Sequence, residues 1–252
     1  MAVSVKKIDE KHGVARYLVK GVSTAFINAI RRSVMLHVPC LAVENVSIYE
    51  NDSVIFDEFL AHRLGMLPVK TDIKGYKKGE TAKMVLEKEG PCTVYSRDIK
   101  STDPKIEVID KNIPLIKLGK GQSVKIEMEA VMQCGEEHSK WQPAIIAYLE
   151  LPKIETEKGC NLCGDCIKAC PKSVLESKAK KIVLNNPVEC ILCGACRDAC
   201  KKDAIKIEPA KDAFILSIEP IAGLSAKETI DAAVDALLEK SEQAQKLLQK
   251  ID

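Results

Sequence analysis

The first forty residues alternate between apolar and polar positions and then repeat at helical spacing, which predicts a β-hairpin followed by a helix. Residues 3–8 and 14–20 have the pattern of strands, and the linker between them ends in a glycine suited to a turn. After Ser23-Thr24, a suitable N-cap, apolar residues recur every three or four positions up to Pro39. Proline disfavours helical geometry in the residue before it, so we expect the helix to end there.

Residues 41–154 carry a mostly strand-like pattern. We expect strands at residues 42–49, 53–56, 84–88, 93–97, 123–131 and 144–151, and one short helix at residues 57–64. The segment 123–131 alternates cleanly, with Val124, Ile126 and Met128 on one face and charged side chains on the other. This part of the chain therefore predicts an α+β domain with its own sheet.

The C-terminal segment predicts a strand at residues 214–219 and then a long amphipathic helix. Ser225 and Glu228 have the spacing of a capping box at the start of this helix. An apolar stripe then runs to the end of the chain: Ile230, Val234, Leu237, Leu238, Ala244, Leu247, Leu248 and Ile251. Such a stripe can pack on the protein's own sheet or on another subunit. We expect the stripe to pack on another subunit, because a compact domain rarely needs a helix of about 40 Å.

Eight of the eleven cysteines form two copies of one run, thirty residues apart. Each run has the spacing Cys-x2-Cys-x2-Cys-x3-Cys, and Pro171 follows the first of them. This spacing is typical of two-cluster ferredoxins, in which the fourth cysteine of each run ligates the cluster of the other run. The expected ligand sets are Cys160, Cys163, Cys166 and Cys200 for one [4Fe–4S] cluster, and Cys190, Cys193, Cys196 and Cys170 for the second. Crossed ligands would hold together a module of about 50 residues that has little core of its own.

Zinc is the alternative for these cysteines, because four thiolates also suit Zn²⁺. Zinc ribbons usually use two separated Cys-x2-Cys pairs rather than four cysteines in one run, so two iron–sulfur clusters are the preferred interpretation. Cys40, Cys92 and Cys134 lie outside the runs, and we expect them to pack in the core.

Composition and charge narrow the classes of function. No apolar run approaches the roughly 18 residues that a membrane-spanning helix needs, and the N-terminus lacks the apolar segment of a secretory signal. We therefore expect a cytoplasmic protein that uses its cysteines for metal in a reducing compartment. The four histidines are scattered and no phosphate-binding glycine loop is present, so the sequence predicts no active site.

Charge argues against a nucleic-acid-binding surface. The net charge is only +2, although residues 158–206 contain ten basic and five acidic side chains. Two clusters of about −2 each would nearly cancel this local surplus. We therefore expect no direct binding to nucleic acid.

Two further segments resemble a known family. Residues 23–35 (STAFINAIRRSVM) and 57–69 (DEFLAHRLGMLPV) are similar to the α motif of RNA polymerase assembly subunits. With the cysteine insertion, the chain resembles the archaeal D-type members of this family, the counterparts of the bacterial α N-terminal domain, over nearly its whole length. Lys201 departs from the pattern, because a second Cys-Pro would be expected there.

The resemblance implies a fold made of three parts. These are an α-subunit-like dimerisation domain built discontinuously from residues 1–38 and 206–252, an inserted mainly-β domain at 39–157, and an inserted ferredoxin-like domain at 158–205. It also implies a non-catalytic subunit that pairs with the smaller subunit L, joins the small subunits N and P, and forms a platform for the large catalytic subunits. The clusters would stabilise their domain, and their redox state would offer a way to control assembly.

The residues expected at partner interfaces lie on the two helices of the dimerisation domain. They are Asn28, Arg31, Arg32, Ile230, Val234, Leu237 and Leu238. Within this set, Arg31 and Arg32 are expected to contact a large subunit, because arginine is favoured at protein interfaces.

An electron-transfer ferredoxin, or a subunit of an oxidoreductase, is the competing hypothesis, because the same ligands serve both roles. No nicotinamide or flavin fingerprint such as GxGxxG accompanies the cysteines. The cysteine module is also basic before its clusters are counted, whereas diffusible ferredoxins are typically acidic. The assembly-subunit interpretation is therefore preferred.

Overall fold

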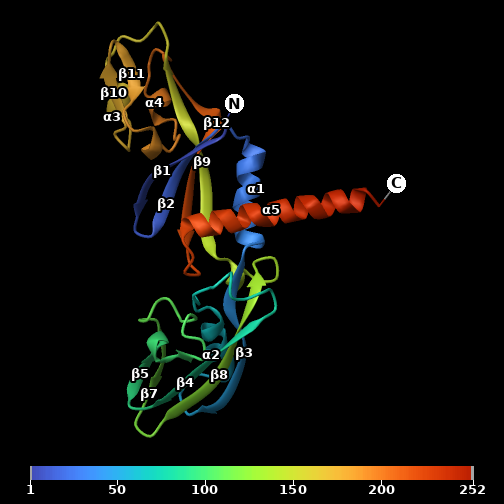
Figure 1. Cartoon of the computed structure of the whole chain (residues 1–252). Helices are drawn as coiled ribbons and strands as arrows, with labels where there is room; N and C mark the ends of the chain where they lie inside the picture. The colour runs from blue at the N-terminus through green and yellow to red at the C-terminus, as the bar shows by residue number, and fades with distance from the viewer. Residues whose placement is uncertain (1, 251–252) are drawn as a thin grey trace. The chain divides into compact units, whose positions relative to one another are not determined.

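The computed structural model describes residues 2–250 and has a mixed α and β fold (Figure 1). Its contacts divide the chain into two compact units, and both are discontinuous in sequence. The first unit contains the residues up to Lys11, Ala15–Asn28 and Ala147–Ser217; the second contains His12–Val14, Ala29–Ile146 and the residues from Ile218 onward. No helix among the described residues is long and apolar enough to cross a membrane.

A four-stranded sheet with the order β1-β2-β12-β9 forms the framework of the first unit. Its strands are β1 (Ser4–Lys11), β2 (Val14–Lys20), β9 (Ala144–Thr156) and β12 (Ile205–Pro220). The expected N-terminal hairpin is therefore confirmed. Phe214 of β12 is fully buried, and its ring packs edge-on against Tyr148 of β9 at a centroid distance of 5.8 Å.

Strand β12 is much longer than the expected strand at residues 214–219. Its added part begins at Ile205 and includes Pro209 and several charged side chains, so it lacks the apolar run that would mark a strand. Pairing with β9 supplies the missing stabilisation. Glu157 N donates to Ala204 O at 2.9 Å at one end of this pair, and Ile221 N donates to Pro143 O at 2.7 Å at the other, so the two strands are antiparallel.

The cysteine runs lie between β9 and β12 and fold as two similar halves. Each half contains one short helix, α3 (Asp165–Lys168) or α4 (Ala195–Asp198), and the hairpin of β10 (Leu175–Lys178) and β11 (Lys181–Leu184) lies between the helices. The small core of this part contains cysteine ligand candidates as well as aliphatic side chains. Its buried members are Cys166, Leu175, Ile182, Cys196 and Ile205.

The second unit contains a sheet with the order β3-β8-β4-β6 and a separate two-stranded ribbon. The sheet strands are β3 (Pro39–Asn51), β4 (Thr81–Glu89), β6 (Lys100–Ser101) and β8 (Ser123–Cys134), and the ribbon pairs β5 (Cys92–Tyr95) with β7 (Pro114–Leu118). The expected alternation of β8 is confirmed, since Val124, Ile126 and Met128 are all at most 1% exposed. Helix α2 (Asp57–Gly65) adds Leu60 and Leu64 to the same core.

One strand prediction in this unit was wrong, and another extended two residues too far. Residues 53–56 form no strand, because Asn51 and Ser53 close a compact turn through their side chains: Ser53 Oγ donates to Asn51 Oδ1 at 2.6 Å and Asn51 Nδ2 donates to Ile55 O at 2.9 Å. Such side-chain bonds compete with strand pairing. The expected strand at 93–97 ends at Tyr95, where Asp98 accepts from Tyr95 N at 2.8 Å and starts a short 3₁₀ turn.

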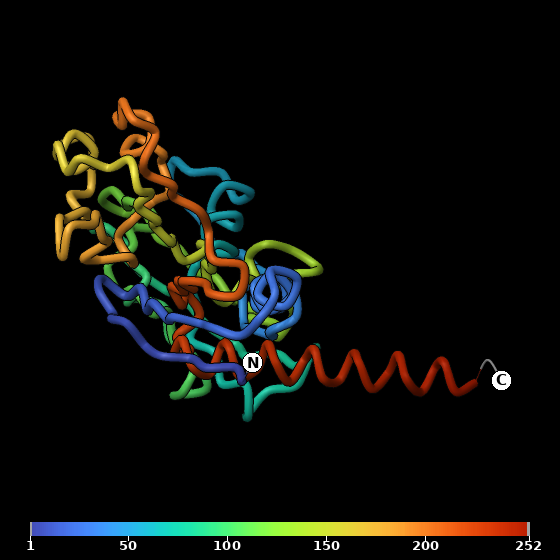
Figure 2. Tube along the Cα trace, turned by 90° about the horizontal axis from the view of Figure 1, so that it is seen from above, coloured from blue at the N-terminus to red at the C-terminus, as the bar shows by residue number. Residues whose placement is uncertain are grey.

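Helices α1 (Thr24–Leu36) and α5 (Ala226–Leu248) correspond to the helices predicted near the two ends of the chain. The capping box of α5 is present, with Ser225 Oγ accepting from Glu228 N at 3.2 Å. In the second unit the helices meet where Ser33, which is 1% exposed, donates to Ala233 O at 2.8 Å. Residues 239–248 are all exposed, and Figure 2 shows this half of α5 extending away from α1.

Candidate metal centre

The eight cysteines of the two runs line two separate cavities in the first unit. One cavity, called the polar cavity below, is lined by Cys160, Cys163, Cys166 and Cys200. The other, called the apolar cavity, is lined by Cys170, Cys190, Cys193 and Cys196. Three cysteines of each cavity come from one run and the fourth comes from the other run, which is the grouping expected from the sequence.

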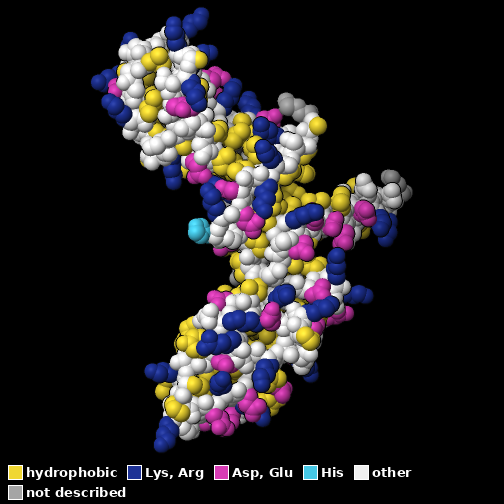
Figure 3. All heavy atoms as spheres, turned by 60° about the vertical axis from the view of Figure 1, so that its left-hand side comes forward, with side chains coloured by type: hydrophobic (Ala, Val, Ile, Leu, Met, Phe, Trp, Pro, Cys, Tyr) yellow, Lys and Arg dark blue, Asp and Glu magenta, His cyan; other side chains and the backbone are white. Residues whose placement is uncertain are grey.

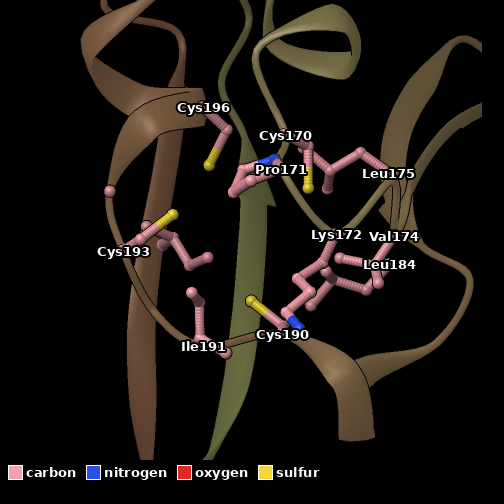
Figure 4. Close-up of a pocket in the computed structure, with 12 residues that line it drawn as sticks. Cys170, Pro171, Lys172, Val174, Leu175, Leu184, Cys190, Ile191, Cys193 and Cys196 are labelled. Carbon is pink, nitrogen blue, oxygen red and sulfur yellow. The ribbon is translucent and has the colours of Figure 1, made fainter.

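Figure 4 shows the four cysteines around the apolar cavity. The sulfur atoms of Cys170, Cys190, Cys193 and Cys196 point toward a common space between the two runs. Cys190 and Cys193 lie on the loop before α4, Cys196 lies on α4 itself, and Cys170 follows α3. The short helix thus turns its cysteine back toward the loop that carries the first two.

Left-handed backbone conformations shape both loops in the same way. Leu162 and Leu192, each just before the second cysteine of its run, have φ of 59° and 53°, and Gly164 and Gly194 follow with φ of 82° and 80°. Glycine adopts such angles at little cost, whereas leucine does so with strain. Strain of this kind is typical of sites where the surrounding structure must fix a loop around a ligand.

The residues fit a cluster better than a single ion. The empty space within the apolar and polar cavities is about 340 Å³ and 740 Å³, respectively, and both figures include space open to solvent. Within residues 2–250, no group of three or more His, Cys, Asp or Glu side chains closes around a position for one metal ion. Each cavity instead brings four thiols together around one space, and four thiols are the donor set of a [4Fe–4S] cluster.

Comparison with known proteins matches two parts of this architecture. Residues 46–147 match the family model described as the RNA polymerase Rpb3/RpoA insert domain, and residues 159–205 match the 4Fe-4S dicluster domain. The first segment corresponds to the sheet and α2 of the second unit, and the second covers both cavities. The dicluster match favours iron–sulfur over zinc.

Curated relatives match over the whole length. DNA-directed RNA polymerase subunit Rpo3 of Archaeoglobus fulgidus is 37% identical, with 100% of both chains covered. The Rpo3 subunit of Methanothermobacter thermautotrophicus is 40% identical over 90% of this chain and 92% of its own, and that of Methanosarcina acetivorans is 35% identical over 100% and 99%. The chain belongs to the Rpo3 family. Within that family it is a form that carries a dicluster domain.

Burial differs among the cysteines of this Rpo3 family member in the same way in both runs. Cys166 and Cys196 are buried, whereas Cys163 and Cys193 are exposed. Burial raises the pKa of the Cys166 and Cys196 thiols, because it disfavours the charged thiolate. Metal binding must therefore displace protons from these two positions.

The surroundings of the two cavities differ chemically. Apart from its cysteines and Lys172, the apolar cavity is lined mainly by Pro171, Val174, Leu175, Leu184, Ile191 and Ile207. The polar cavity is lined by Asn161, Asp165, Lys201 and Lys202 as well as by Ile182 and Ile205. In Figure 3, Lys and Arg side chains lie at several places on the margin of the dicluster domain, at the top of the view.

An ion-pair network joins the N-terminal hairpin to the second cysteine run. Arg16 of β2 donates two hydrogen bonds to Asp9 of β1, at 2.7 Å and 2.5 Å, and a third to Glu189 at 2.8 Å. Glu189 directly precedes Cys190. The Arg16 guanidinium lowers the pKa of Asp9 to about 2 through these hydrogen bonds. No sequence pattern could have identified this contact, because Arg16 and Glu189 are 173 residues apart.

The residues expected at partner interfaces differ in how exposed they are. Arg32 is exposed, whereas Asn28 and Arg31 are partly buried and Arg31 donates to the sulfur of Met35 at 3.4 Å. Val234 and Leu238 of α5 are 36% and 58% exposed. Ile230 and Leu237 are partly buried. The structure therefore leaves part of the apolar stripe of α5 accessible; Ile251, its last member, lies outside the described residues.

The cysteines outside the runs and two of the histidines lie among residues of the protein's own fold. Cys40 is buried as expected, whereas Cys92 and Cys134 are only partly buried. His37, at the end of α1, lies 3.1 Å from Lys240 Nζ, and His138 caps a short turn by accepting from Lys140 N at 3.1 Å.

Proposed function

We propose that this protein is a non-catalytic assembly subunit of DNA-directed RNA polymerase. The observation that carries this proposal is the end-to-end match to Rpo3 relatives, which covers all of this chain and all of the Archaeoglobus fulgidus protein. In the proposed assembly, the chain pairs with the smaller subunit L, and the small subunits N and P join this pair. The large catalytic subunits then dock on the platform, and the whole process takes place in the cytoplasm.

The pairing with L is assigned to α1 and α5 of the dimerisation domain, residues 1–38 and 206–252. The exposed part of the α5 stripe supports this assignment. Leu247 and Leu248 are 62% and 64% exposed, and Leu238 is 58% exposed. Large aliphatic side chains on one helix face gain most from burial against an apolar partner.

The contact with a large subunit is assigned to α1, through Asn28, Arg31 and Arg32. Arg32 is exposed on this helix and lies one residue before Ser33, which packs against α5. The two helix faces can therefore serve different partners. Arginine suits such a contact, because its planar guanidinium makes several directed hydrogen bonds.

We further propose that the dicluster domain, residues 158–205, holds two [4Fe–4S] clusters. Cys160, Cys163, Cys166 and Cys200 hold one, and Cys170, Cys190, Cys193 and Cys196 hold the other. When bound, the clusters supply covalent cross-links between the two cysteine runs and a redox-sensitive element. The protein's own residues carry this effect outward, since Glu189 beside Cys190 is bound by Arg16 of the N-terminal hairpin. Loss of a cluster would thereby weaken docking of the large subunits while pairing with L persists.

Tagged protein expressed together with the other polymerase subunits tests this function. We expect the wild-type chain to co-purify with L, N, P and the large subunits. Leu238→Asp should lose L and all other subunits, because it places a charge in the apolar face of α5. Arg32→Glu should retain L but recover at least about fivefold less of the large subunits, equivalent to about 1 kcal/mol.

Glu239→Lys is the matched control, because Glu239 is exposed on α5 next to Leu238 but lies outside the apolar stripe. This variant should recover every subunit. Recovery of a dehydrogenase or hydrogenase in place of polymerase subunits would overturn the proposal in favour of electron transfer. Normal recovery of L with Leu238→Asp would refute the assignment of α5.

A further inference from the structure

The two cysteine cavities are built on one repeated pattern but have unlike linings. The difference begins at the residue after the fourth cysteine of each run, which is Pro171 in the first run and Lys201 in the second. Because the ligands cross, Pro171 lines the apolar cavity and Lys201 lines the polar cavity. The next position is lysine in both runs, Lys172 and Lys202.

Net charge by itself does not distinguish the cavities. Lys201 and Lys202 in the polar cavity are partly offset by Asp165, which leaves one surplus positive charge, and Lys172 gives the apolar cavity one as well. The difference is therefore in polarity and space. The polar cavity has more space for water, with a cavity volume of about 270 Å³ against about 20 Å³.

A hydrogen bond to sulfur adds to this difference. Ala204 N donates to Cys200 Sγ at 3.3 Å, and Cys200 belongs to the polar cavity. The corresponding donor for Cys170 would be Val174 N. Among residues 2–250, no hydrogen bond from Val174 N to the Cys170 sulfur is present.

We propose that the two cavities give their clusters different reduction potentials, and that the cluster in the polar cavity has the higher potential. This inference rests on the proposed cluster binding. Reduction takes one electron from an external donor and changes the charge of a four-thiolate cluster from about −2 to about −3, with no bond broken. Polar side chains, water and an N–H donor stabilise the added negative charge, whereas an aliphatic lining does not.

The assignment has a regulatory consequence. A moderate fall in the ambient potential reduces the cluster of the polar cavity and leaves the other oxidised. The cluster of the polar cavity is then the redox-responsive one, and the cluster of the apolar cavity is a structural cross-link. Lys201 and Asp165 act on the reduction potential of the responsive cluster in opposite directions. The positive charge of Lys201 raises this potential, and the negative charge of Asp165 lowers it.

The test is a redox titration of the full-length protein, purified without oxygen and reduced with dithionite or Ti(III), with the reduced clusters followed by electron paramagnetic resonance. We expect two one-electron steps. Lys201→Gln should lower only the higher potential, and Asp165→Asn should raise only that potential. Each change should alter the ratio of reduced to oxidised cluster about three- to tenfold at fixed potential, which is about 30 to 60 mV for one electron.

Lys172→Gln is the matched control, because Lys172 lies in the apolar cavity at the position equivalent to Lys202. It should lower only the lower potential. A single unresolved step, or a shift of the lower potential by Lys201→Gln, would overturn this inference.

Iron and sulfide analysis of the same samples separates this outcome from failure of the underlying proposal. About eight irons per chain with a single potential refutes only the difference between the cavities. Absence of iron, or stoichiometric zinc, refutes cluster binding itself.

Discussion

The three cysteines outside the runs show how one residue type acquires different properties from its surroundings. Cys40 is 1% exposed, and burial raises the pKa of its thiol to about 12. Burial also raises the pKa of Cys134, which is partly exposed. Cys92 is partly exposed, and its thiol donates to Glu89 O at 3.4 Å. Since the thiolate is the reactive form, these differences govern reactivity.

Thiol alkylation of the cluster-loaded protein near pH 8 should therefore modify the three cysteines in a fixed order. We expect Cys92 to react first, Cys134 more slowly, and Cys40 only after unfolding. Peptide mass spectrometry at successive times measures this order, and the same reaction in denaturant, where all three should react alike, is the control. Early labelling of Cys40 would show that its site opens in the native state.

At the scale of elements, Arg16 links the N-terminal hairpin to the second cysteine run through Glu189. Arg16 and Asp9 have side chains that are 22% and 23% exposed, and Glu189 is 40% exposed. The low pKa of Asp9 keeps its carboxylate charged over the working range of pH. Its contribution is fully present above about pH 4, the ordinary range of an aspartate, and is lost as the pH falls through about 2.

Arg16→Met should loosen the loop that carries Cys190 without removing a ligand. Partly exposed charge pairs contribute up to about 1 kcal/mol, so we expect iron release to a chelator to accelerate by up to about fivefold. Glu189→Gln removes only the Arg16–Glu189 pair, so its effect should be equal or smaller, and the double variant should add little to Arg16→Met, which already breaks this pair.

Lys7→Met is the control for this experiment, since it breaks the exposed Lys7–Glu10 pair on the same hairpin. Its rate of iron release should equal that of the wild-type protein. Equal rates for wild type and Arg16→Met would show that the hairpin does not stabilise the cysteine loop.

At the scale of the whole molecule, the chain enters and leaves the dicluster domain at neighbouring positions of one sheet. Strands β9 and β12 are neighbours in the sheet, and Glu157 N donates to Ala204 O where they end and begin. The rest of the sheet therefore needs only a short connection at this position. The proposal that residues 158–205 are an insertion can therefore be tested by deleting them.

Replacing residues 158–203 with Asn-Gly should give a protein that folds and still pairs with L. Asn-Gly favours the two-residue turn that joins antiparallel strands. Circular dichroism, a cooperative thermal transition and co-purification with L measure the outcome, and iron should be absent. A version with Gly-Gly-Ser-Gly at the same place controls for turn geometry. Failure of both versions to fold would show that the dicluster domain is part of the core rather than an insertion.

The sequence by itself determined the features that depend on near neighbours in the chain. These include the N-terminal hairpin, the alternating faces of β8, the capping box of α5 and the two cysteine runs, because each follows from spacing within a short segment. The incorrect strand at residues 53–56 has the same origin, since a local turn formed by Asn51 and Ser53 outweighed a weak apolar pattern.

Only the tertiary structure decided the features that join distant segments. It extended β12 by pairing it with β9, placed Arg16 against Glu189, and gave two similar cysteine runs unlike cavities by crossing Cys170 and Cys200 between them. The physical reason is the same in each case. The stabilising contact lies between residues far apart in the chain, so neither partner carries a local signal of the other.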